Sequence, residues 1–343
     1  MELKIKNIGK IKEGNVELDG ITVISGKGDA GKTTVLKTLS TVLDVINFSS
    51  DSVNFSCEQN KIENNEEIIQ KDVQARFENN FGKIINNIFS NDKGMAEIII
   101  GDETKKLETL KISINENFAK IEENDVKTKI ENIFIDNPAD LKNTNVDTLL
   151  EKNAGHKNVF LFNDCGMESE IDYKKFKRLN EVVKGTFKLL NPVEYELGEY
   201  GYEIPDEKKN ESDTKTVIPL KNLSHSLKKL AFLKMIIEKL LLKENDILIV
   251  DSAEDGLHPE MQLVFGETVV LMQKEFGIKV VLTTQSPFLL EAIEVFSEKY
   301  DIENKTHYYL MEDGNIKNVD DETRQIYKEM VKPIQELENI KYE

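Results

Sequence analysis

The sequence is short of cysteine, of long apolar runs and of basic residues. Its two cysteines, Cys57 and Cys165, lie far apart and outside any CxxC or metal-ligand spacing, so each is predicted to be a small, at least partly buried residue in a reducing compartment. No apolar run reaches the roughly 18 residues that a membrane helix requires, and the first residues lack the apolar region of a signal peptide. We therefore expect a cytoplasmic protein with no membrane partner.

Acidic residues outnumber basic ones by 63 to 45 in the 343-residue chain, which gives a formal net charge of −18. Phosphate binding needs local positive charge, so this balance argues against a surface dedicated to coating nucleic acid. A local basic groove is still compatible with it, and a nucleic acid partner is not strongly predicted. The length and the 39% of hydrophobic residues suffice for one large domain or two ordinary ones.

A complete phosphate-binding loop follows the apolar run 21–24 and precedes a helical apolar pattern that extends to residue 46. It fits G-x-x-x-x-G-K-[ST] in full and consists of Gly26, Lys27, Gly28, Asp29, Ala30, Gly31, Lys32 and Thr33. In such a loop backbone N–H groups wrap a phosphate, Lys32 adds a positive charge, and the Thr33 hydroxyl is a magnesium ligand. The sequence thus predicts a nucleotide site made of this loop, which we call the P-loop, and Thr34.

A second apolar strand is predicted at 247–250 and ends in Asp251, a natural magnesium ligand. About 220 residues separate Thr33 from Asp251, which excludes a compact kinase or a small GTPase and demands a long inserted arm. The run 304–307 has the asparagine and lysine of a guanine-reading NKxD box but lacks its aspartate, so it carries little weight.

The apolar patterning divides the chain into three predicted parts: one half of a nucleotide-binding head at 1–50, an inserted arm at 51–215 and the other half at 216–343. In the head, strands are predicted at 3–8, 16–18, 21–24, 247–251, 279–284, 307–311 and 316–319, and helices at 34–46, 227–242, 259–276 and from 322 onward. In the arm, helices are predicted at 73–89 and 172–190, strands at 96–100, 111–114 and 130–135, and a polar loop at 208–215. This pattern is typical of an α/β fold, a mixed or parallel sheet flanked by helices, with a long α+β insertion.

Four motifs follow one another in the last third of the chain. They are NLSHSLKK at 222–229, ILIVD at 247–251, GLHPEMQ at 256–262 and TTQSP at 283–287. Together with the P-loop they resemble the signature, Walker B, D-loop and switch of bacterial ABC-type AAA family ATPases, related to RecF, SMC proteins and the heads of overcoming-lysogenization-defect nucleases. The resemblance covers roughly residues 1–50 and 215–340 and implies a P-loop NTPase head that binds ATP and Mg²⁺, the metal on Thr33 and Asp251.

In that family two heads pair face to face, and each nucleotide lies between the P-loop of one subunit and the signature of the other. The resemblance therefore implies that Ser224, His225 and Ser226 face the γ-phosphate of a partner, where a helix N-terminus suits an anion. The family usually has Ser-Gly or Gly-Gly where this chain has His225-Ser226. The bulkier histidine either reshapes closure of the pair or is an exposed cap residue with no ligand role.

Two departures fall on residues that cut ATP in the family. Ser252 stands where the family has the glutamate that polarises the attacking water, and serine is no carboxylate base at neutral pH. Glu254 matches the family's second acidic position, and Gln285 replaces the switch histidine with a side chain that donates hydrogen bonds but carries no charge. We assign no catalytic residue among these three and expect ATP binding with slow or absent hydrolysis, so whether the chain is an ATPase stays open.

Three functions are compatible with these residues. The first is an ATP-dependent clamp, formed by a homodimer or with a related ATPase subunit, in bacterial defence or DNA maintenance. The second is an active ATPase of DNA repair or anti-phage defence that recruits Glu254, and the third is a nucleotide-sensing scaffold that restrains a separate effector protein. Gln59 and Gln70 are candidates for the Q-loop by location, and the lysines of 228–239 are expected on a solvated helix face.

Overall fold

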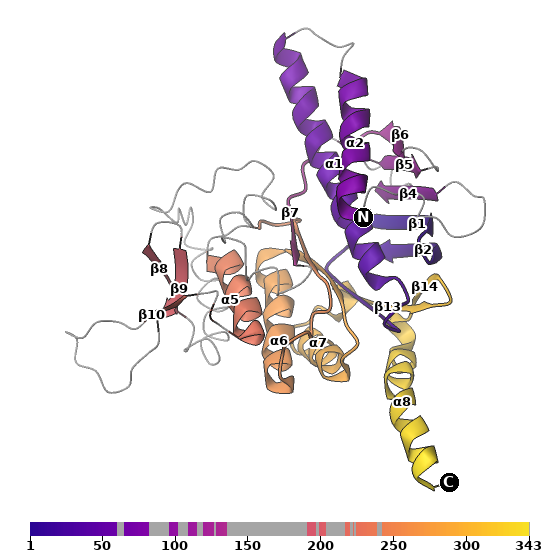
Figure 1. Ribbon diagram of the computed structural model, residues 1–343, viewed down its shortest axis with the longest axis vertical. Helices are drawn as coiled ribbons and strands as arrows, with labels where there is room; N and C mark the ends of the chain where they lie inside the picture. Colours follow the sequence, from indigo (N-terminus) through magenta and orange to yellow (C-terminus); the bar gives the residue numbers. More distant parts are fainter. Residues whose placement is uncertain are drawn as a thin grey trace, which may run out of the picture.

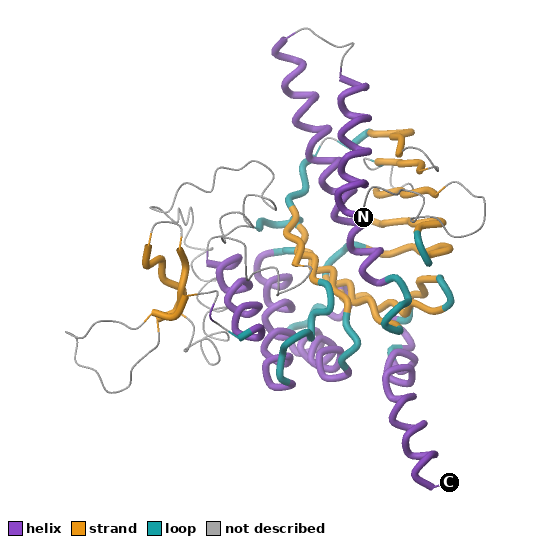
Figure 2. Tube along the Cα trace, viewed as in Figure 1, coloured by secondary structure: helices purple, strands orange, loops and turns teal. Residues whose placement is uncertain are grey.

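Residues 1–59, 65–81, 96–101, 109–114, 119–126, 128–135, 191–196, 199–203, 217–219, 222, 224–238 and 242–342 are described by the computed structural model, and the fold given below is that of these residues. An 11-stranded mixed sheet in the order β6-β5-β4-β1-β2-β14-β13-β3-β12-β11-β7 forms the centre, with helices packed on both faces (Figures 1 and 2).

The parallel half of the sheet carries the P-loop. Its five strands are β3 (Ile21–Gly26), β7 (Asn132–Ile135), β11 (Ile247–Val250), β12 (Lys279–Thr283) and β13 (Thr306–Glu312). β3 lies between β12 and β13 and is parallel to both, and β11 follows between β12 and β7. Nearly every residue of these strands is buried, because helices cover both faces of the sheet, and this explains their continuous apolar sequence.

The other half of the sheet is mainly antiparallel. It consists of β1 (Glu2–Ile8), β2 (Ile11–Glu17), β4 (Ala96–Gly101), β5 (Leu110–Ile114), β6 (Ala119–Asn124) and β14 (Asn315–Asn318). Buried and partly exposed residues alternate along β4, as expected for a strand with one packed face. β14 joins the halves, since it pairs antiparallel with β13 and parallel with β2.

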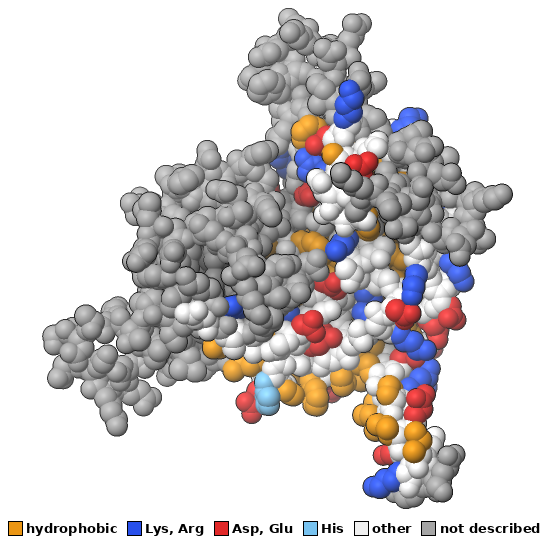
Figure 3. Space-filling model, viewed as in Figure 1, with side chains coloured by type: hydrophobic (Ala, Val, Ile, Leu, Met, Phe, Trp, Pro, Cys, Tyr) orange, Lys and Arg blue, Asp and Glu red, His pale blue; other side chains and the backbone are white. Residues whose placement is uncertain are grey.

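Two hydrophobic cores lie on opposite faces of the sheet. One is covered by α1 (Lys32–Gln59) and α2 (Asn65–Phe81), and the other by α5 (His225–Glu238), α6 (Pro259–Phe276), α7 (Pro287–Lys299) and the start of α8 (Arg324–Tyr342). The rest of α8 projects away from the body of the molecule (Figure 1). Its residues Ile334, Leu337 and Ile340 are exposed, as are Leu263 of α6 and Phe288 and Val295 of α7. Figure 3 shows apolar side chains on the lower edge of the body and along α8.

Short signals in the sequence set the ends of α6. His258 caps its N-terminus, with Nδ1 accepting from the Glu260 backbone N–H at 3.4 Å, and Pro259 occupies the first turn, where its missing N–H costs nothing. At the other end Gly277 adopts a left-handed conformation and its N–H donates to the Gln273 carbonyl at 2.9 Å. The predicted helix at 259–276 is confirmed.

The predicted α/β fold class is confirmed, and the elements predicted for the head are present. Two of them are longer than predicted: the helix predicted at 34–46 is α1, which extends to Gln59, and the strand predicted at 16–18 is β2, which begins at Ile11. The helix predicted at 73–89 begins earlier, as α2, while 82–89, the helix at 172–190 and the loop at 208–215 lie outside the described residues. The antiparallel sheet of β8 (Asn191–Glu196), β9 (Glu199–Glu203) and β10 (Val217–Pro219) was not predicted. The span 51–215 contributes β4 to β7 to the head sheet itself, and the division into three parts stays a prediction.

Within the described part of the chain, none of the helices combines the length and the apolar character that a membrane crossing requires.

Candidate functional site

The P-loop lies where β3 ends and α1 begins. Gly26 has φ of 147°, and a Cβ there would lie 2.6 Å from the Met311 carbonyl oxygen of β13, so the close approach of the two strands requires glycine. Gly31 has φ of 101°, directly before the first helical residue, Lys32. The left-handed backbone therefore turns the chain from the strand into the helix.

Lys32 is folded back over the P-loop. Its Nζ donates to the carbonyl oxygens of Gly26 and Lys27, both at 2.7 Å, and its side chain is nearly buried. Burial lowers the pKa of Lys32, while the negative charges of Glu254, Asp251 and Asp29 act in the opposite direction. A cation held between these carboxylates and the P-loop backbone is placed to meet a phosphate.

Asp251 is held by two threonine hydroxyls, each donating to one of its carboxylate oxygens. The Thr33 Oγ1 donates to Oδ2 at 2.6 Å, and the Thr283 Oγ1 of β12 donates to Oδ1 at 2.5 Å. Asp251 and Thr283 are both buried. The residues predicted to bind magnesium, Thr33 and Asp251, are thus brought together from positions 218 apart in the sequence.

The segment 251–257, which we call the Walker B loop, leaves the strand through a left-handed residue. Ser252 has φ of 46°, and its N–H donates to the Thr283 Oγ1 at 2.7 Å. The Ala253 N–H donates to the Thr283 carbonyl at 2.9 Å. Thr283 therefore bonds three consecutive residues of the Walker B loop, including Asp251.

Glu254 ties the Walker B loop to the switch segment 283–287. Its Oε1 accepts from the Gln285 backbone N–H at 2.8 Å. Its Oε2 is buried and, among the residues that the structure describes, has no hydrogen-bond partner. The charge of Glu254 raises the pKa of Lys32 more than that of any other carboxylate. The site therefore contains, near Lys32, a carboxylate oxygen that has no hydrogen-bond donor among the described residues.

The D-loop and the switch segment are also joined directly. The Ser286 Oγ donates to the Gln262 Oε1 at 2.5 Å, and the Gln262 Nε2 donates to the Leu257 carbonyl at 2.9 Å. Ser286 and Gln262 are both buried. The motifs at 256–262 and 283–287 therefore form one connected unit.

The signature residues lie at the start of α5. Ser224 precedes the helix, and its carbonyl accepts from the Lys228 N–H at 3.0 Å. The Ser226 Oγ donates to the Gly256 carbonyl at 2.5 Å, so its hydroxyl is bound to the Walker B loop of its own chain. The side chain of His225 lies outside the described residues, as do those of Gln59 and Gln70, so their predicted roles stay predictions.

The prediction of a solvated lysine face on α5 is wrong. Lys228, Lys229 and Lys234 are only 1%, 0% and 7% exposed, and Lys239 lies outside the described residues. The Lys229 Nζ donates to the carbonyl oxygens of Ser252 and Ala253 at 3.0 and 3.1 Å. A buried ammonium is tolerated there because backbone oxygens replace its water.

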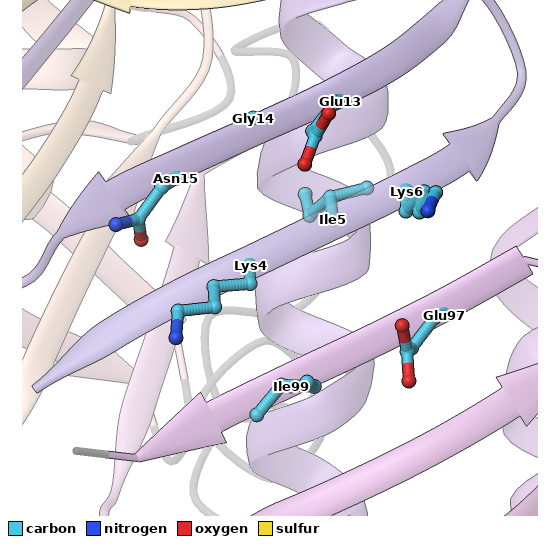
Figure 4. Close-up of a pocket in the computed structure, with 8 residues that line it drawn as sticks. All are labelled: Lys4, Ile5, Lys6, Glu13, Gly14, Asn15, Glu97 and Ile99. Atoms are coloured by element: carbon cyan, nitrogen blue, oxygen red, sulfur yellow. The ribbon is translucent and has the colours of Figure 1, made fainter. Parts of the chain in front are cut away.

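A separate cavity of about 420 Å³ lies on the face of β1, β2 and β4 shown in Figure 4. It is lined by residues of both charges and a few apolar ones: Lys4, Ile5, Lys6, Glu13, Gly14, Asn15, Glu97 and Ile99. Glu97 forms an ion pair with Lys111 of β5. No residue of this lining belongs to the P-loop, the Walker B loop or the switch segment.

Two residues that organise this candidate site were not predicted. Thr283 was noted only as part of the switch motif, although it positions Asp251 and Ser252. Lys229 was assigned to the surface, although it holds the Walker B loop. Both roles depend on contacts between segments that are distant in sequence, so no local pattern indicated them.

Comparison with known proteins identifies the fold. No protein-family model and no curated protein sequence matches the chain. The structure is similar to an Smc head domain from Pyrococcus furiosus, solved with an extended coiled coil and bound to the C-terminal domain of ScpA; the TM-score is 0.51 at 12% identity, over 96% of this chain and 99% of that one. Lower TM-scores relate it to the SMC head domain of Thermotoga maritima (0.42, 13% identity, 93% and 97% covered) and to the recombination mediator protein RecF (0.41, 9% identity, 93% and 97% covered). The chain therefore has the fold of an ABC-type P-loop ATPase head, as the motifs predicted.

Proposed function

We propose that this protein is an ATP-binding ABC-type head that uses ATP-dependent pairing of two heads as a conformational clamp, with slow or absent hydrolysis. The observation that supports it most directly is the Thr33–Asp251 contact at 2.6 Å, beside an intact P-loop and next to Ser252 in place of a catalytic glutamate. These observations support nucleotide binding, and Ser252 and Gln285 in place of a glutamate and a histidine support slow hydrolysis.

The residues present fit Mg·ATP. The Thr33 hydroxyl and the Asp251 carboxylate converge, and hard oxygen ligands of this kind are those that Mg²⁺ prefers. Bound there, Mg²⁺ neutralises phosphate charge. On the protein side, Lys32 exchanges its bonds to the Gly26 and Lys27 carbonyls for phosphate oxygens, and the N-terminus of α1 faces the same anion.

Slow hydrolysis is proposed because of what stands at the two replaced positions. Ser252 offers no carboxylate, and its N–H is bound to Thr283. Gln285 is neutral, and its backbone N–H is bound to Glu254. Neither residue is a base for a water molecule at neutral pH.

Pairing is proposed because Ser224 and Ser226 lie at the N-terminus of α5, where a partner's γ-phosphate would meet a helix dipole. The Ser226 hydroxyl must then release the Gly256 carbonyl to which it donates. The partner is a second copy of this chain or a related ATPase subunit. A separate effector protein restrained by the clamp is a further proposal, whose test is co-purification that depends on Lys32.

The experiment measures binding, pairing and turnover on one preparation. Titration calorimetry with Mg·ATP should give binding that Lys32→Ala abolishes, and sedimentation should show a dimer only with ATP. Single-turnover hydrolysis should be slow and should rise in Ser252→Glu. Absence of ATP binding, or fast hydrolysis that Lys32→Ala removes, would refute the clamp.

A second candidate function is an active ATPase of DNA repair or anti-phage defence that uses Glu254 as its base. The buried Oε2 of Glu254, which has no hydrogen-bond partner among the described residues, favours it, because a general base needs a free oxygen near the reacting atoms. Glu254→Gln decides between the two, since only an active ATPase loses a large part of its rate. Steep salt-dependent DNA affinity would add a nucleic acid partner to either function.

A further inference from the structure

Lys229 is a fully buried lysine that the proposed binding of ATP does not use. It lies on α5, three residues after Ser226, and its exposed fraction is 0%. Its Nζ reaches the carbonyl oxygens of Ser252 and Ala253 at 3.0 and 3.1 Å. Both acceptors belong to the Walker B loop, so the helix of the signature segment contacts the loop that carries Asp251 and Glu254.

The charge of Lys229 is matched to this place. Burial lowers its pKa to about 8, and the negative charges of Asp255, Glu254 and Asp251 act in the opposite direction. A buried ammonium is costly unless its donors are bound and its charge is compensated. Here backbone oxygens supply the hydrogen bonds and the carboxylates of the Walker B loop supply the charge.

The part of the Walker B loop that Lys229 binds is the part under conformational strain. Ser252 has φ of 46°, a left-handed conformation that is unfavourable for a residue with a Cβ. The Ser252 carbonyl also accepts from the Asp255 N–H at 2.9 Å, and the Glu254 carbonyl from the Leu257 N–H at 2.9 Å. Lys229 and the Ser226 hydroxyl therefore hold the loop from the side of α5, and Thr283 holds it from the side of β12.

We propose that Lys229 is a positioning residue that fixes the Walker B loop to α5, so that the orientation of Glu254 and Asp251 depends on the position of the signature helix in the same chain. The nucleotide role of that loop rests on the proposed function. If a partner's nucleotide contacts the N-terminus of α5 and shifts this helix, the shift reaches the Walker B loop through Lys229. The nucleotide bound by the partner then affects the Walker B loop of this chain without any change in the P-loop.

The first test is amide hydrogen exchange of the nucleotide-free chain, because it does not depend on ATP binding. In Lys229→Met, which keeps the aliphatic stem, peptides covering 252–257 should exchange about tenfold faster, while peptides of β12 and α6 stay unchanged. Lys229→Gln keeps a hydrogen-bond donor, so its exchange rate over 252–257 should lie between those of the wild type and Lys229→Met. It replaces Lys229→Met in this test if that variant does not fold. The matched control is Leu233→Ala, which removes a buried apolar side chain of the same helix and no hydrogen bond to the loop.

The second test is the Mg²⁺-dependent part of ATP affinity, the ratio of the Kd in EDTA to the Kd with Mg²⁺. It should fall at least about fivefold in Lys229→Met, because a displaced Walker B loop takes Asp251 with it, and stay within about twofold in Leu233→Ala. Either of two results would show that Lys229 is only a packing residue. The first is amide exchange that rises evenly over the C-terminal half, and the second is a ratio of the two Kd values that stays unchanged in both Lys229→Met and Lys229→Gln. If the wild-type chain binds no ATP, the proposed function fails, and the exchange result alone decides on Lys229.

Discussion

Thr283→Val offers a direct test of how the acidic end of the site is built. Valine has nearly the shape of threonine, but it lacks the hydroxyl that donates to Asp251 Oδ1 at 2.5 Å and accepts from the Ser252 N–H at 2.7 Å. Thr283 is fully buried. The substitution therefore removes two hydrogen bonds and leaves both partners in place, with little room for water to replace them.

The expected loss follows from the two orphaned groups. A hydrogen bond to a charged acceptor contributes about 1.5–3 kcal/mol, and a partly buried backbone N–H without an acceptor costs about 1 kcal/mol. Asp251 keeps its bond from Thr33, which limits the damage. We expect Thr283→Val to lower the free energy of unfolding by about 2–4 kcal/mol and to weaken Mg·ATP binding more than binding in EDTA.

Urea unfolding followed by circular dichroism measures this loss, with Thr268→Val as the matched control. Thr268 is also a buried threonine, but its Oγ1 donates at 2.7 Å to the Val264 carbonyl four residues earlier in α6. Removing that bond leaves a carbonyl that still accepts within the helix, so the control should lose less than about 1 kcal/mol. Equal losses for the two variants would refute the idea that Thr283 organises the Walker B loop.

Three further predictions concern packing, charge and the exposed helix. Gly266→Ala should destabilise the chain by about 1–3 kcal/mol in urea, since its Cβ would lie 2.9 Å from the Ala292 Cβ where α6 meets α7, and Ala292→Gly should restore stability in the double variant. Above about pH 8, wild type should gain stability relative to Lys229→Met by up to about 1.4 kcal/mol per pH unit. The reason is that Lys229 in the unfolded chain still binds a proton there, whereas the folded residue, with its lowered pKa, has lost it. A stability difference that does not change with pH across that range would contradict this. Leu337→Ser on α8 should change the free energy of unfolding by no more than about 0.5 kcal/mol, because the side chain is 67% exposed, and a larger loss would show that the leucine is covered in solution.

Local patterns were enough to predict the strand–loop–helix unit around Lys32 and the apolar strand that ends at Asp251. Both depend on residues adjacent in sequence, and the continuous apolar runs 21–24 and 247–250 reflect burial on two faces. β6 was missed because its sequence AKIEEN is mostly charged and only its first residue is buried, as at the edge of a sheet. Edge strands give a weak periodic signal.

The position of Lys229 was not predictable from helical periodicity. A lysine on a helix is normally assigned to water, and only the tertiary placement of Ser252 and Ala253 supplies oxygens that replace it. The same holds for Thr283, whose role depends on Asp251 lying beside it across β11 and β12. Bonds between distant segments complete this site, and no window of local sequence contains them.

The place of β3 in the sheet also determines when the P-loop can form during synthesis. Its two neighbours, β12 and β13, begin at Lys279 and Thr306, so the strand that carries the loop has no partner until nearly the whole chain has been made. At a synthesis rate of about 5–20 residues per second this delay is roughly 10–60 s. A chain that ends before residue 279 carries an apolar strand without either of its neighbours, and a chain that ends before residue 306 still lacks one of them. The close approach of Gly26 to Met311 of β13 is therefore a contact of the finished chain, and it cannot guide the folding of the first half.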